Sequence, residues 1–160
     1  MSEINYRPIG IIRTPFKEPK GTPIQPTGAE GVKGSVHLNP DYREGLKDLD
    51  GFSHLILLYH FHLAEGYSLL VRPYLDKDLH GVFATRIPGR PNPIGLSIVR
   101  LVGIEGCILH IEDVDIIDGT PLLDIKPYVP AFDHRETKGI GWLTGRSRNV
   151  RSTKSDGRLK

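Results

Sequence analysis

The sequence predicts an all-β-dominated fold: a single-domain β-barrel with one or two short helices. Short apolar runs with period-two alternation recur along the chain, and clusters of Gly, Pro, Asn and Asp separate them. Few stretches carry a helical period. The length of 160 residues is that of one domain, enough to bury a core without disulfides or structural metal. We therefore expect the strands to close, or nearly close, on one another.

The N-terminal third is expected to hold two strands on either side of a long loop. Tyr6 to Arg13 alternates and contains β-branched residues, which indicates a first strand. Thr14 to Gly31 carries four prolines and three glycines and has no period of either kind, so we predict a loop. Val32 to Leu38 reads as the second strand. An Asn-Pro pair follows it and predicts a short surface helix over Pro40 to Leu46.

The most apolar stretch, Phe52 to Leu63, is predicted to be a long central strand. Its alternation places His54, His60 and His62 on one face and leucines and aromatics on the other. A His-x-His pair on a strand can present two imidazoles to one metal ion, as in cupin-like barrels. No further ligand cluster follows downstream, so we predict no metal site and favour pocket-lining or hydrogen-bonded core histidines.

The second half of the chain is predicted to contain a hairpin and two more strands. Leu96 to Ile104 and Cys107 to Ile111 read as a hairpin because a Glu-Gly turn separates them. Asp113 to Ile117 alternates apolar and acidic residues and is expected to be another strand. An Asp-Gly turn signal then precedes the last strand, Thr120 to Tyr128. Beyond it neither pattern holds, and Trp142 either pins the chain to the barrel or lies in a subunit contact.

The charge of the chain is unevenly distributed. The net charge is +2, but residues 146–160 hold six basic residues and one acidic residue. We expect a body domain over residues 1–145 and a basic, disordered tail over 146–160 that either attracts a polyanion or only aids solubility. Cys107 is the single cysteine, so there is no disulfide framework, and no apolar run is long enough for a membrane span. We therefore expect a soluble, cytoplasmic protein with no membrane partner.

A rigid loop within Ala84 to Ser97, ATRIPGRPNPIGLS, is the strongest candidate for a binding site. Three prolines stiffen it, and Arg86 and Arg90 offer planar donors suited to a carboxylate or phosphate. The alternative is a tight barrel corner whose arginines make only surface ion pairs. Gln25, held between two prolines, offers an amide to a ligand.

Several enzyme classes are disfavoured by missing motifs. There is no phosphate-loop lysine motif, no Gly-x-Gly-x-x-Gly opening a βαβ unit and no Gly-x-Ser-x-Gly elbow. Polar residues in rigid surroundings gather in four places: Gln25, the strand end at His60 to Leu63, Arg86 to Gly95, and Asp118 to Pro121. If these places converge, they suit a zwitterionic small molecule that carries hydroxyl groups.

Four motifs make the chain resemble the TrmO (TsaA/YaeB-like) family of tRNA methyltransferases. They are IGIIRTPF from Ile9, LKDLDGFSHLILLYHFH from Leu46, GVFATR…RPNPIGLS from Gly81, and DIIDGTPLLDIKPYVP from Asp115. The resemblance spans most of residues 6–143. It implies a homodimeric β-barrel that uses S-adenosylmethionine to methylate the exocyclic amino group of threonylcarbamoyl-adenosine at position 37, beside the tRNA anticodon.

The resemblance also implies site residues. The implied cofactor-binding residues are Gln25, His62, Leu63, Arg86, Leu96, Asp118, Gly119, Thr120 and Pro121. Arg90, Asn92, Lys126 and Tyr128 are then left to face tRNA. The proton acceptor is left open between Asp118, a backbone carbonyl and a group of the substrate.

This chain departs from the family pattern in two ways. Ile87 stands where a serine commonly follows the ATR triplet, and the chain ends soon after Trp142, without the extra C-terminal domain of longer members. The basic tail would then supply attraction for tRNA. Two alternatives remain open, namely a cupin-like metalloenzyme and a noncatalytic module that senses S-adenosylmethionine.

Overall fold

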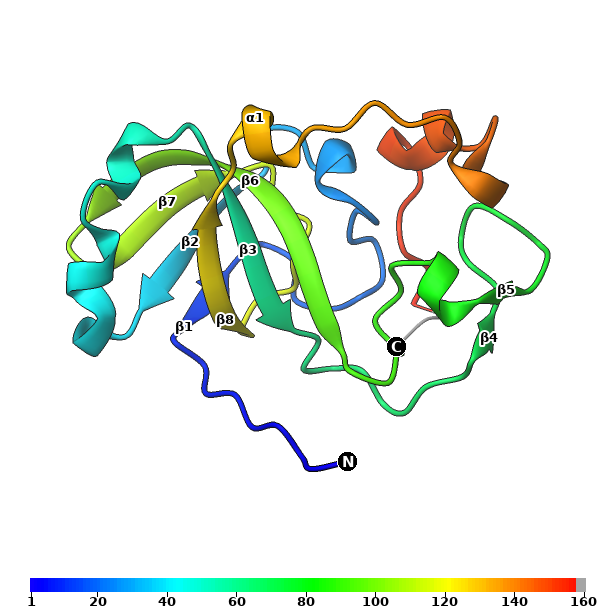
Figure 1. Cartoon of the computed structure of the whole chain (residues 1–160), viewed down its shortest axis with the longest axis horizontal. Helices are drawn as coiled ribbons and strands as arrows, with labels where there is room; N and C mark the ends of the chain where they lie inside the picture. The colour runs from blue at the N-terminus through cyan, green and yellow to red at the C-terminus, as the bar shows by residue number, and fades with distance from the viewer. Residues whose placement is uncertain (158–160) are drawn as a thin grey trace.

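A computed structural model of the chain describes residues 1–157 and contains a closed antiparallel barrel of six strands (Figure 1). Around the barrel the order is β1-β2-β7-β6-β3-β8. The strands are β1 (Gly10–Arg13), β2 (Lys33–Leu38), β3 (His54–His60), β6 (Ile94–Glu105), β7 (Ile108–Glu112) and β8 (Thr120–Pro127). The predicted fold class is confirmed.

The barrel closes where β1 pairs with β8. Gly10, Ile11 and Ile12 pair with β2 on one side and with β8 on the other. β1 is shorter than the strand predicted from Tyr6: Ile9 still makes backbone hydrogen bonds with Leu122 and Asn39, but Tyr6 is exposed. Closure leaves no unpaired edge in this sheet.

The alternation predicted for the central strand is confirmed by burial. Along β3, Leu55, Leu57 and Tyr59 are buried in the barrel, whereas His54 and His60 lie on the outer face. Burying the apolar set on one face is what fixes the register of a strand. The core comprises Ile12, Val36, Leu38, Leu55, Leu57, Tyr59, Val99, Leu109, Ile111, Val114, Ile116 and Leu122.

The predicted hairpin is present as β6 and β7, but the strand expected at Asp113 to Ile117 is absent. Asp113 has a φ of 67°, a left-handed value that ends the extended run of β7. Its carboxylate accepts a hydrogen bond from the amide of Gly31, so the Asp113 side chain ties this turn to the end of the long loop. The following residues form an irregular connection that leads across one end of the barrel to β8.

Helical structure among the described residues is confined to short turns. The predicted helix appears as a 3-10 helix, η2 (Pro40–Leu46), and the Asn39 side chain caps it by accepting from the Asp41 amide. The single α-helical turn is α1 (Pro130–Asp133). The remaining 3-10 helices are η1 (Pro26–Gly28), η3 (Leu49–Gly51), η4 (Val82–Ala84), η5 (Gly141–Leu143) and η6 (Ser147–Arg151).

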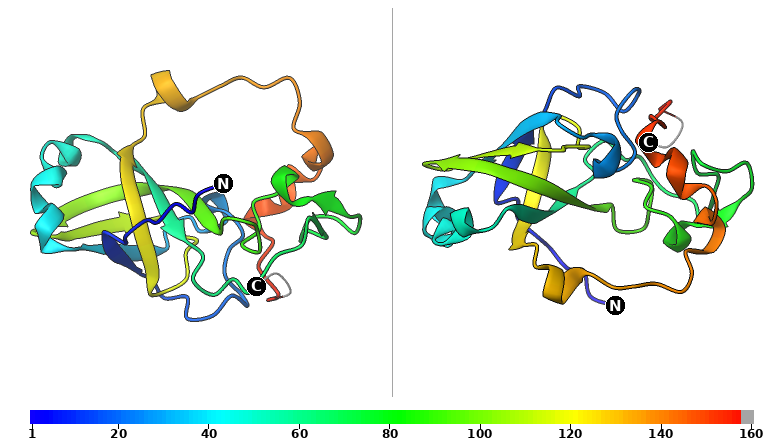
Figure 2. Two further views of the ribbon diagram at one scale, coloured as in Figure 1. Left: turned by 60° about the horizontal axis from the view of Figure 1, so that its bottom comes forward. Right: turned by 90° about the horizontal axis from the view of Figure 1, so that it is seen from above.

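Beside the barrel, the chain between β3 and β6 makes an excursion that carries the two-stranded ribbon of β4 (Leu70–Val71) and β5 (His80–Gly81) (Figures 1 and 2). It has a small core of its own in which Ile87 packs with Val71 and Val82. An apolar side chain at position 87 therefore has a packing role, which accounts for isoleucine where the family pattern has serine.

Trp142 ties the C-terminal segment to this excursion. Its ring stacks on His80, with ring centroids 4.5 Å apart, and its Nε1–H donates to the Ala84 carbonyl at 2.8 Å. Of the two roles left open for Trp142, the structure shows the pinning role, and the attachment is to the excursion beside the barrel. Arg146 adds an ion pair to Asp76.

Residues 146–157, expected to be a disordered tail, run back along the excursion and the long loop (Figure 2). η6 begins in this segment, Pro23 and Lys154 form an isolated β-bridge, and the Ser155 hydroxyl bonds to that of Tyr74 at 2.8 Å. Backbone pairing and part-buried contacts account for the difference from a prediction that rested on charge alone. Residues 158–160 of the expected tail lie outside the described residues.

Candidate functional site

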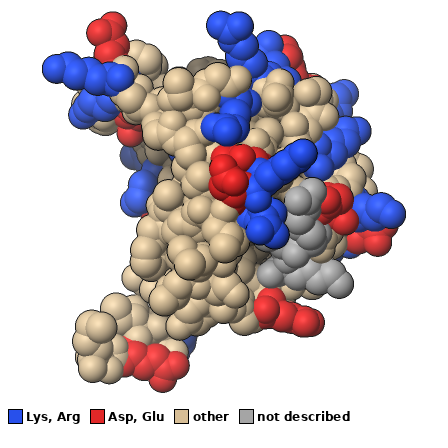
Figure 3. Space-filling model, turned by 90° about the vertical axis from the view of Figure 1, so that its right-hand side faces the viewer, with Lys and Arg blue, Asp and Glu red and all other residues tan. Residues whose placement is uncertain are grey.

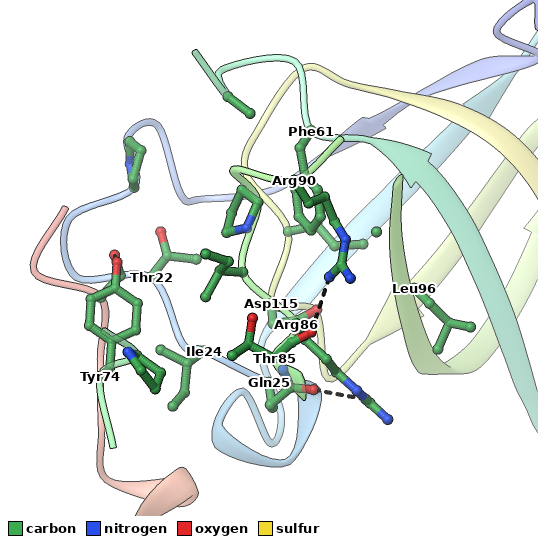
Figure 4. Close-up of a pocket in the computed structure, with 18 of the residues that line it drawn as sticks. Thr22, Ile24, Gln25, Phe61, Tyr74, Thr85, Arg86, Arg90, Leu96 and Asp115 are labelled. Atoms are coloured by element: carbon green, nitrogen blue, oxygen red, sulfur yellow. Dashed lines mark hydrogen bonds between the residues drawn. The ribbon is translucent and has the colours of Figure 1, made fainter. Parts of the chain in front are cut away.

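A pocket of about 710 Å³ opens between one end of the barrel and the excursion (Figure 4). Its wall combines the long loop around Thr22 to Gln25, the end of β3, the loop before β6, the connection before β8 and the C-terminal segment. Pockets for cofactors and small ligands commonly have volumes of about 300–1,000 Å³. The pocket is therefore large enough for a nucleoside-sized ligand.

The structure brings most of the predicted site residues to this pocket. Those that line it are Gln25, His62, Leu63, Arg86, Arg90, Leu96 and Thr120. Asp118, Gly119 and Pro121 adjoin Thr120 in the chain but are not part of the lining. Asn92 is exposed on the loop before β6.

Lys126 and Tyr128 lie away from the pocket. They are at the far end of β8, where Pro127 pairs with Leu55, whereas the pocket lies where Leu122 pairs with Tyr59. Lys126 pairs with Asp124, and the Tyr128 ring packs edge-on against His54. The predicted tRNA-facing set is thus divided between two ends of the barrel.

Arg86 and Gln25 contact each other across the pocket. The Arg86 Nη1 group donates to Gln25 Oε1 at 3.1 Å, which links the long loop to the rigid loop before β6 (Figure 4). Arg90 turns back and donates to the carbonyl of Thr85 at 3.1 Å. Since a guanidinium has five donors, each arginine keeps donors for a ligand. Of the two interpretations of this loop, the pocket geometry favours a binding loop over a corner with surface ion pairs.

Asp118 holds the connection before β8 to the start of the long loop. Its Oδ1 accepts from the Thr14 amide at 3.0 Å, and its Oδ2 accepts from Lys17 Nζ at 2.7 Å. The Lys17 ammonium and the Thr14 amide hold the pKa of this carboxyl below its usual range. Gly119 adopts a φ of 79°, which glycine tolerates and which makes the turn into β8.

His62 has one ring nitrogen fixed by Thr120. The Thr120 hydroxyl donates its proton to the Ile117 carbonyl at 2.7 Å, so the contact of 3.3 Å between Thr120 Oγ1 and His62 Nδ1 is made with His62 as donor. Burial and the neighbouring His60 lower the pKa of His62. The ring is thus neutral at physiological pH, with its proton on Nδ1 and Nε2 left as an acceptor.

The main polar group that the sequence analysis missed is Asp115. It lines the pocket, and its Oδ1 accepts from the Ser97 hydroxyl at 2.6 Å. Ser97 is in turn 2.9 Å from the Tyr59 hydroxyl. The motif DIIDGTP contains Asp115, but its alternation was interpreted as a strand face, and nothing in the local pattern pairs it with Ser97.

Most of the pocket wall is apolar. Ile24, Phe61 and Leu96 supply apolar surface, and Thr22 and Tyr74 add hydroxyl groups (Figure 4). Such a lining suits the purine ring and the carbon atoms around the sulfonium of S-adenosylmethionine, while Gln25 and Arg86 match its polar ends. The donor set present thus fits this cofactor. Within residues 1–157 no group of three or more His, Cys, Asp or Glu side chains is arranged to hold a metal ion.

The face at the pocket end of the molecule carries mixed charge beside a broad uncharged area (Figure 3). Arg148, Arg151 and Lys154 belong to the C-terminal segment at this end. Long apolar helices of the kind that span a bilayer do not occur in the described part of the chain.

Comparison with known proteins gives consistent matches. Residues 11–134 match the family described as tRNA-methyltransferase O N-terminal domain. A probable S-adenosyl-L-methionine-binding protein of Pyrococcus abyssi is 59% identical over 98% of this chain and 85% of its own length. A tRNA (adenine(37)-N6)-methyltransferase of Escherichia coli is 41% identical over 81% of this chain and 60% of its own length.

A solved structure gives the same result in three dimensions. The crystal structure of TrmO from Pseudomonas aeruginosa superposes with a TM-score of 0.74 at 40% sequence identity. The match covers 88% of this chain and 63% of the other, so the chain spans less than two thirds of the solved protein.

Proposed function

Because this chain belongs to the tRNA-methyltransferase O family, we propose that it transfers a methyl group from S-adenosylmethionine to the exocyclic amino nitrogen of an adenosine in tRNA. The substrate we propose is threonylcarbamoyl-adenosine at position 37. The observation that carries the proposal is the pocket, whose wall includes six of the nine implied cofactor residues together with the rigid arginine loop.

The contacts within the pocket support a division of roles. Arg86, paired with Gln25, is suited to the carboxylate of the methionine part, because a guanidinium matches a carboxylate with two parallel donors. His62 Nε2 is left free by the Thr120 contact and is suited to accept a hydrogen bond from an N–H or O–H group of the cofactor. The turn from Asp118 to Pro121 adjoins Thr120 and is proposed to reach the cofactor through backbone groups.

Positioning is expected to supply much of the rate. Methyl transfer from a sulfonium is an in-line displacement, and the amino group of adenine is a poor nucleophile because its lone pair is delocalised into the ring. Holding the two reactants in line in a largely apolar pocket lowers the entropic part of the activation free energy for methyl transfer. The sulfonium supplies the methyl group and leaves as a neutral thioether.

The tRNA is proposed to approach over the rim of the pocket. Arg90 lines the pocket and Asn92 is exposed beside it, so both are suited to the nucleotide that enters. Lys126 and Tyr128, at the other end of β8, are suited only to a more distant part of a bound tRNA. Because tRNA is abundant in the cytoplasm, we infer that the protein acts there.

The test is to incubate the pure protein with radiolabelled S-adenosylmethionine and tRNA, with and without the threonylcarbamoyl group, and then to analyse the nucleosides. Label on the modified adenosine alone is the expected result. Label on unmodified tRNA would contradict the proposed substrate. Cofactor binding with no label on either tRNA would support a sensor, and metal-dependent turnover of another substrate would favour the cupin-like alternative.

We also propose that the protein is a homodimer. Paired residues of β3 and β6 place apolar side chains on the outer face of the barrel: Ile56 lies opposite Ile98 and Leu58 opposite Leu96, and Ile94 lies on the same face. Ile94, Leu96 and Ile98 are 42%, 46% and 37% exposed. A contiguous apolar surface of this kind is suited to a self-complementary contact.

Light scattering tests the dimer. We expect two chains per particle for the wild type and one chain for Ile98→Glu, because a carboxylate opposite itself across a two-fold interface is unfavourable. Val102→Glu, at a more exposed site farther along β6, is the control and should leave the mass unchanged. A monomeric wild type would overturn this proposal.

A further inference from the structure

The resemblance to the family left the proton acceptor of the reaction open, and the structure offers a group for it. Asp115 lies on the connection between β7 and β8, in the wall of the pocket. Its side chain is half-buried, so the carboxylate is shielded from bulk water but remains reachable from the pocket (Figure 4). None of the residues implied by the resemblance is Asp115.

The carboxylate is held by a directed chain of hydrogen bonds. Ser97 gives its only hydroxyl proton to Asp115 Oδ1, so the Tyr59 hydroxyl is the donor to Ser97. Tyr59 and Ser97 are themselves 4% and 0% exposed, and they come from the two paired strands β3 and β6. The barrel wall thus fixes one oxygen, and no other side chain of the described residues donates to this carboxylate.

The electrostatic surroundings leave Asp115 basic enough to accept a proton. Burial raises the pKa of Asp115 to about 7, against the lowering effects of Ser97, its own amide and Arg86. The other ionisable side chains of the pocket wall are Tyr59, His62, Tyr74 and Arg90. Burial and the Asp115 charge raise the pKa of Tyr59, so this residue stays a neutral donor.

We propose that Asp115 Oδ2 accepts the amino proton of the target adenosine as the methyl group is transferred. The bond between the sulfonium sulfur and the methyl carbon breaks and its electron pair stays on sulfur. The bond between that carbon and the amino nitrogen forms, and the N–H electron pair is retained by nitrogen while the proton moves to Asp115. Charge and atoms balance without a further reactant. This inference rests on the proposed methyl transfer.

Two other groups fit this role less well. Asp118 already accepts from the Thr14 amide and Lys17, and its pKa lies below the usual range, so it is a weak base. The pKa of His62 is lowered by burial and by His60, and its Nδ1 already carries the proton that it donates to Thr120, so only Nε2 could accept one. The pKa of Asp115 is raised, whereas those of Asp118 and His62 are lowered, and Asp115 also lines the pocket with one oxygen fixed by Ser97.

The test is Asp115→Asn, which keeps the acceptor for Ser97 and removes the base. We expect kcat for tRNA methylation to fall about 10²- to 10⁴-fold, the usual contribution of general base catalysis, with the Kd for S-adenosylmethionine changed less than about threefold. The wild-type kcat should rise with pH through about pH 7 and then level off. Asp41→Asn, the same change on an exposed residue of η2 far from the pocket, is the control.

Ser97→Ala gives a second readout that a purely structural role would not produce. Losing a donor to the charged form raises the pKa of the carboxyl, so the pH profile of kcat should move to higher pH. A kcat for Asp115→Asn within threefold of wild type would overturn this inference but leave the proposed function standing. So would a loss of cofactor binding as large as the loss in kcat. A wild type that methylates no tRNA would overturn the proposed function and this inference together.

Discussion

Asp115 gives the protein a pH-dependent stability. Its raised pKa, about 7, means that the native state holds the proton more tightly than the unfolded chain does. Stability from this group is therefore greatest at low pH, falls between about pH 4 and pH 7, and stays at the lower value above pH 7. The cost of an ionised buried carboxyl is up to about 4 kcal/mol on this reasoning.

We therefore predict that Asp115→Asn stabilises the fold more at pH 8 than at pH 5. Urea unfolding at both values measures the difference in unfolding free energy between variant and wild type. Asp41→Asn should show no such dependence on pH. An equal effect of Asp115→Asn on the unfolding free energy at both pH values would mean that the pKa of the Asp115 carboxyl is not raised in the native state.

Arg86 is predicted to hold the cofactor. Arg86→Ala removes the guanidinium and its contact with Gln25. Because hydrogen bonds to charged groups contribute about 1.5–3 kcal/mol, we expect the Kd for S-adenosylmethionine to rise roughly 10- to 100-fold in calorimetry. Arg43→Ala, on η2 outside the pocket, is the control. An unchanged Kd and turnover for Arg86→Ala would exclude this role.

Some site residues could be predicted from the sequence, and Asp115 could not. Gln25 and Arg86 were found because prolines around them indicate a stiff backbone, and this signal is local. Asp115 was missed because its importance comes from Ser97 and Tyr59, which are distant in sequence and adjacent only across the β3–β6 pair. Such a network depends on register, and a local pattern does not contain it.

At the level of elements, β3 and β6 meet at a glycine that makes room for the Tyr59 ring. Gly95 pairs with Tyr59, and a Cβ at Gly95 would lie 2.2 Å from Tyr59 Cε2. The ring is buried and bound to Ser97, so it has little room to move. The glycine of the RPNPIG motif thus allows the chain of hydrogen bonds to Asp115.

Gly95→Ala is expected to lower the unfolding free energy by about 1–3 kcal/mol through overpacking, and to reduce methylation by displacing the Tyr59 hydroxyl. Thermal unfolding and the methylation assay measure the two effects. Gly103→Ala is a matched control on the same strand, because a Cβ there meets nothing within 4 Å. Equal stability of the two variants would contradict the account.

Most strands were predictable because each buries one face. The alternation of β3 and β6 is strong, and Asp-Gly or Glu-Gly pairs lie in the turns beside β3, β6 and β8. The strand predicted at Asp113 to Ile117 was wrong because Asp113 takes a left-handed φ to complete a contact with Gly31, which lies far away in sequence. The backbone conformation of this segment is therefore set by tertiary contacts that the local sequence pattern does not contain.

At the level of the whole molecule, the C-terminal segment both completes the pocket and adds positive charge near it. Val150 and Ser155 line the pocket, while Arg146 is engaged with Asp76. A charge pattern alone predicted attraction to a polyanion but not the packing. Removing the positive charges and removing the whole segment should therefore have different effects on tRNA binding and cofactor binding.

Changing Arg148, Arg151 and Lys154 to alanine should weaken tRNA binding and reduce the slope of log K against log salt by up to about 3, with cofactor binding unchanged. Truncation after Gly145 should weaken the binding of both, because it also removes part of the pocket wall. Filter binding at several salt concentrations and calorimetry make the comparison. If neither variant alters tRNA binding, the basic segment only aids solubility.

The pairing of β1 with β8 has a consequence for how the protein is made. Gly10 pairs with Leu122, so the sheet of a growing chain stays open until β8 has left the ribosome. Asp115 precedes β8 and Thr120 begins it, so this part of the pocket wall forms in the same step. A nascent chain that stops short of β8 has neither a closed sheet nor a complete pocket, and Val150 and Ser155 complete the pocket wall later in synthesis.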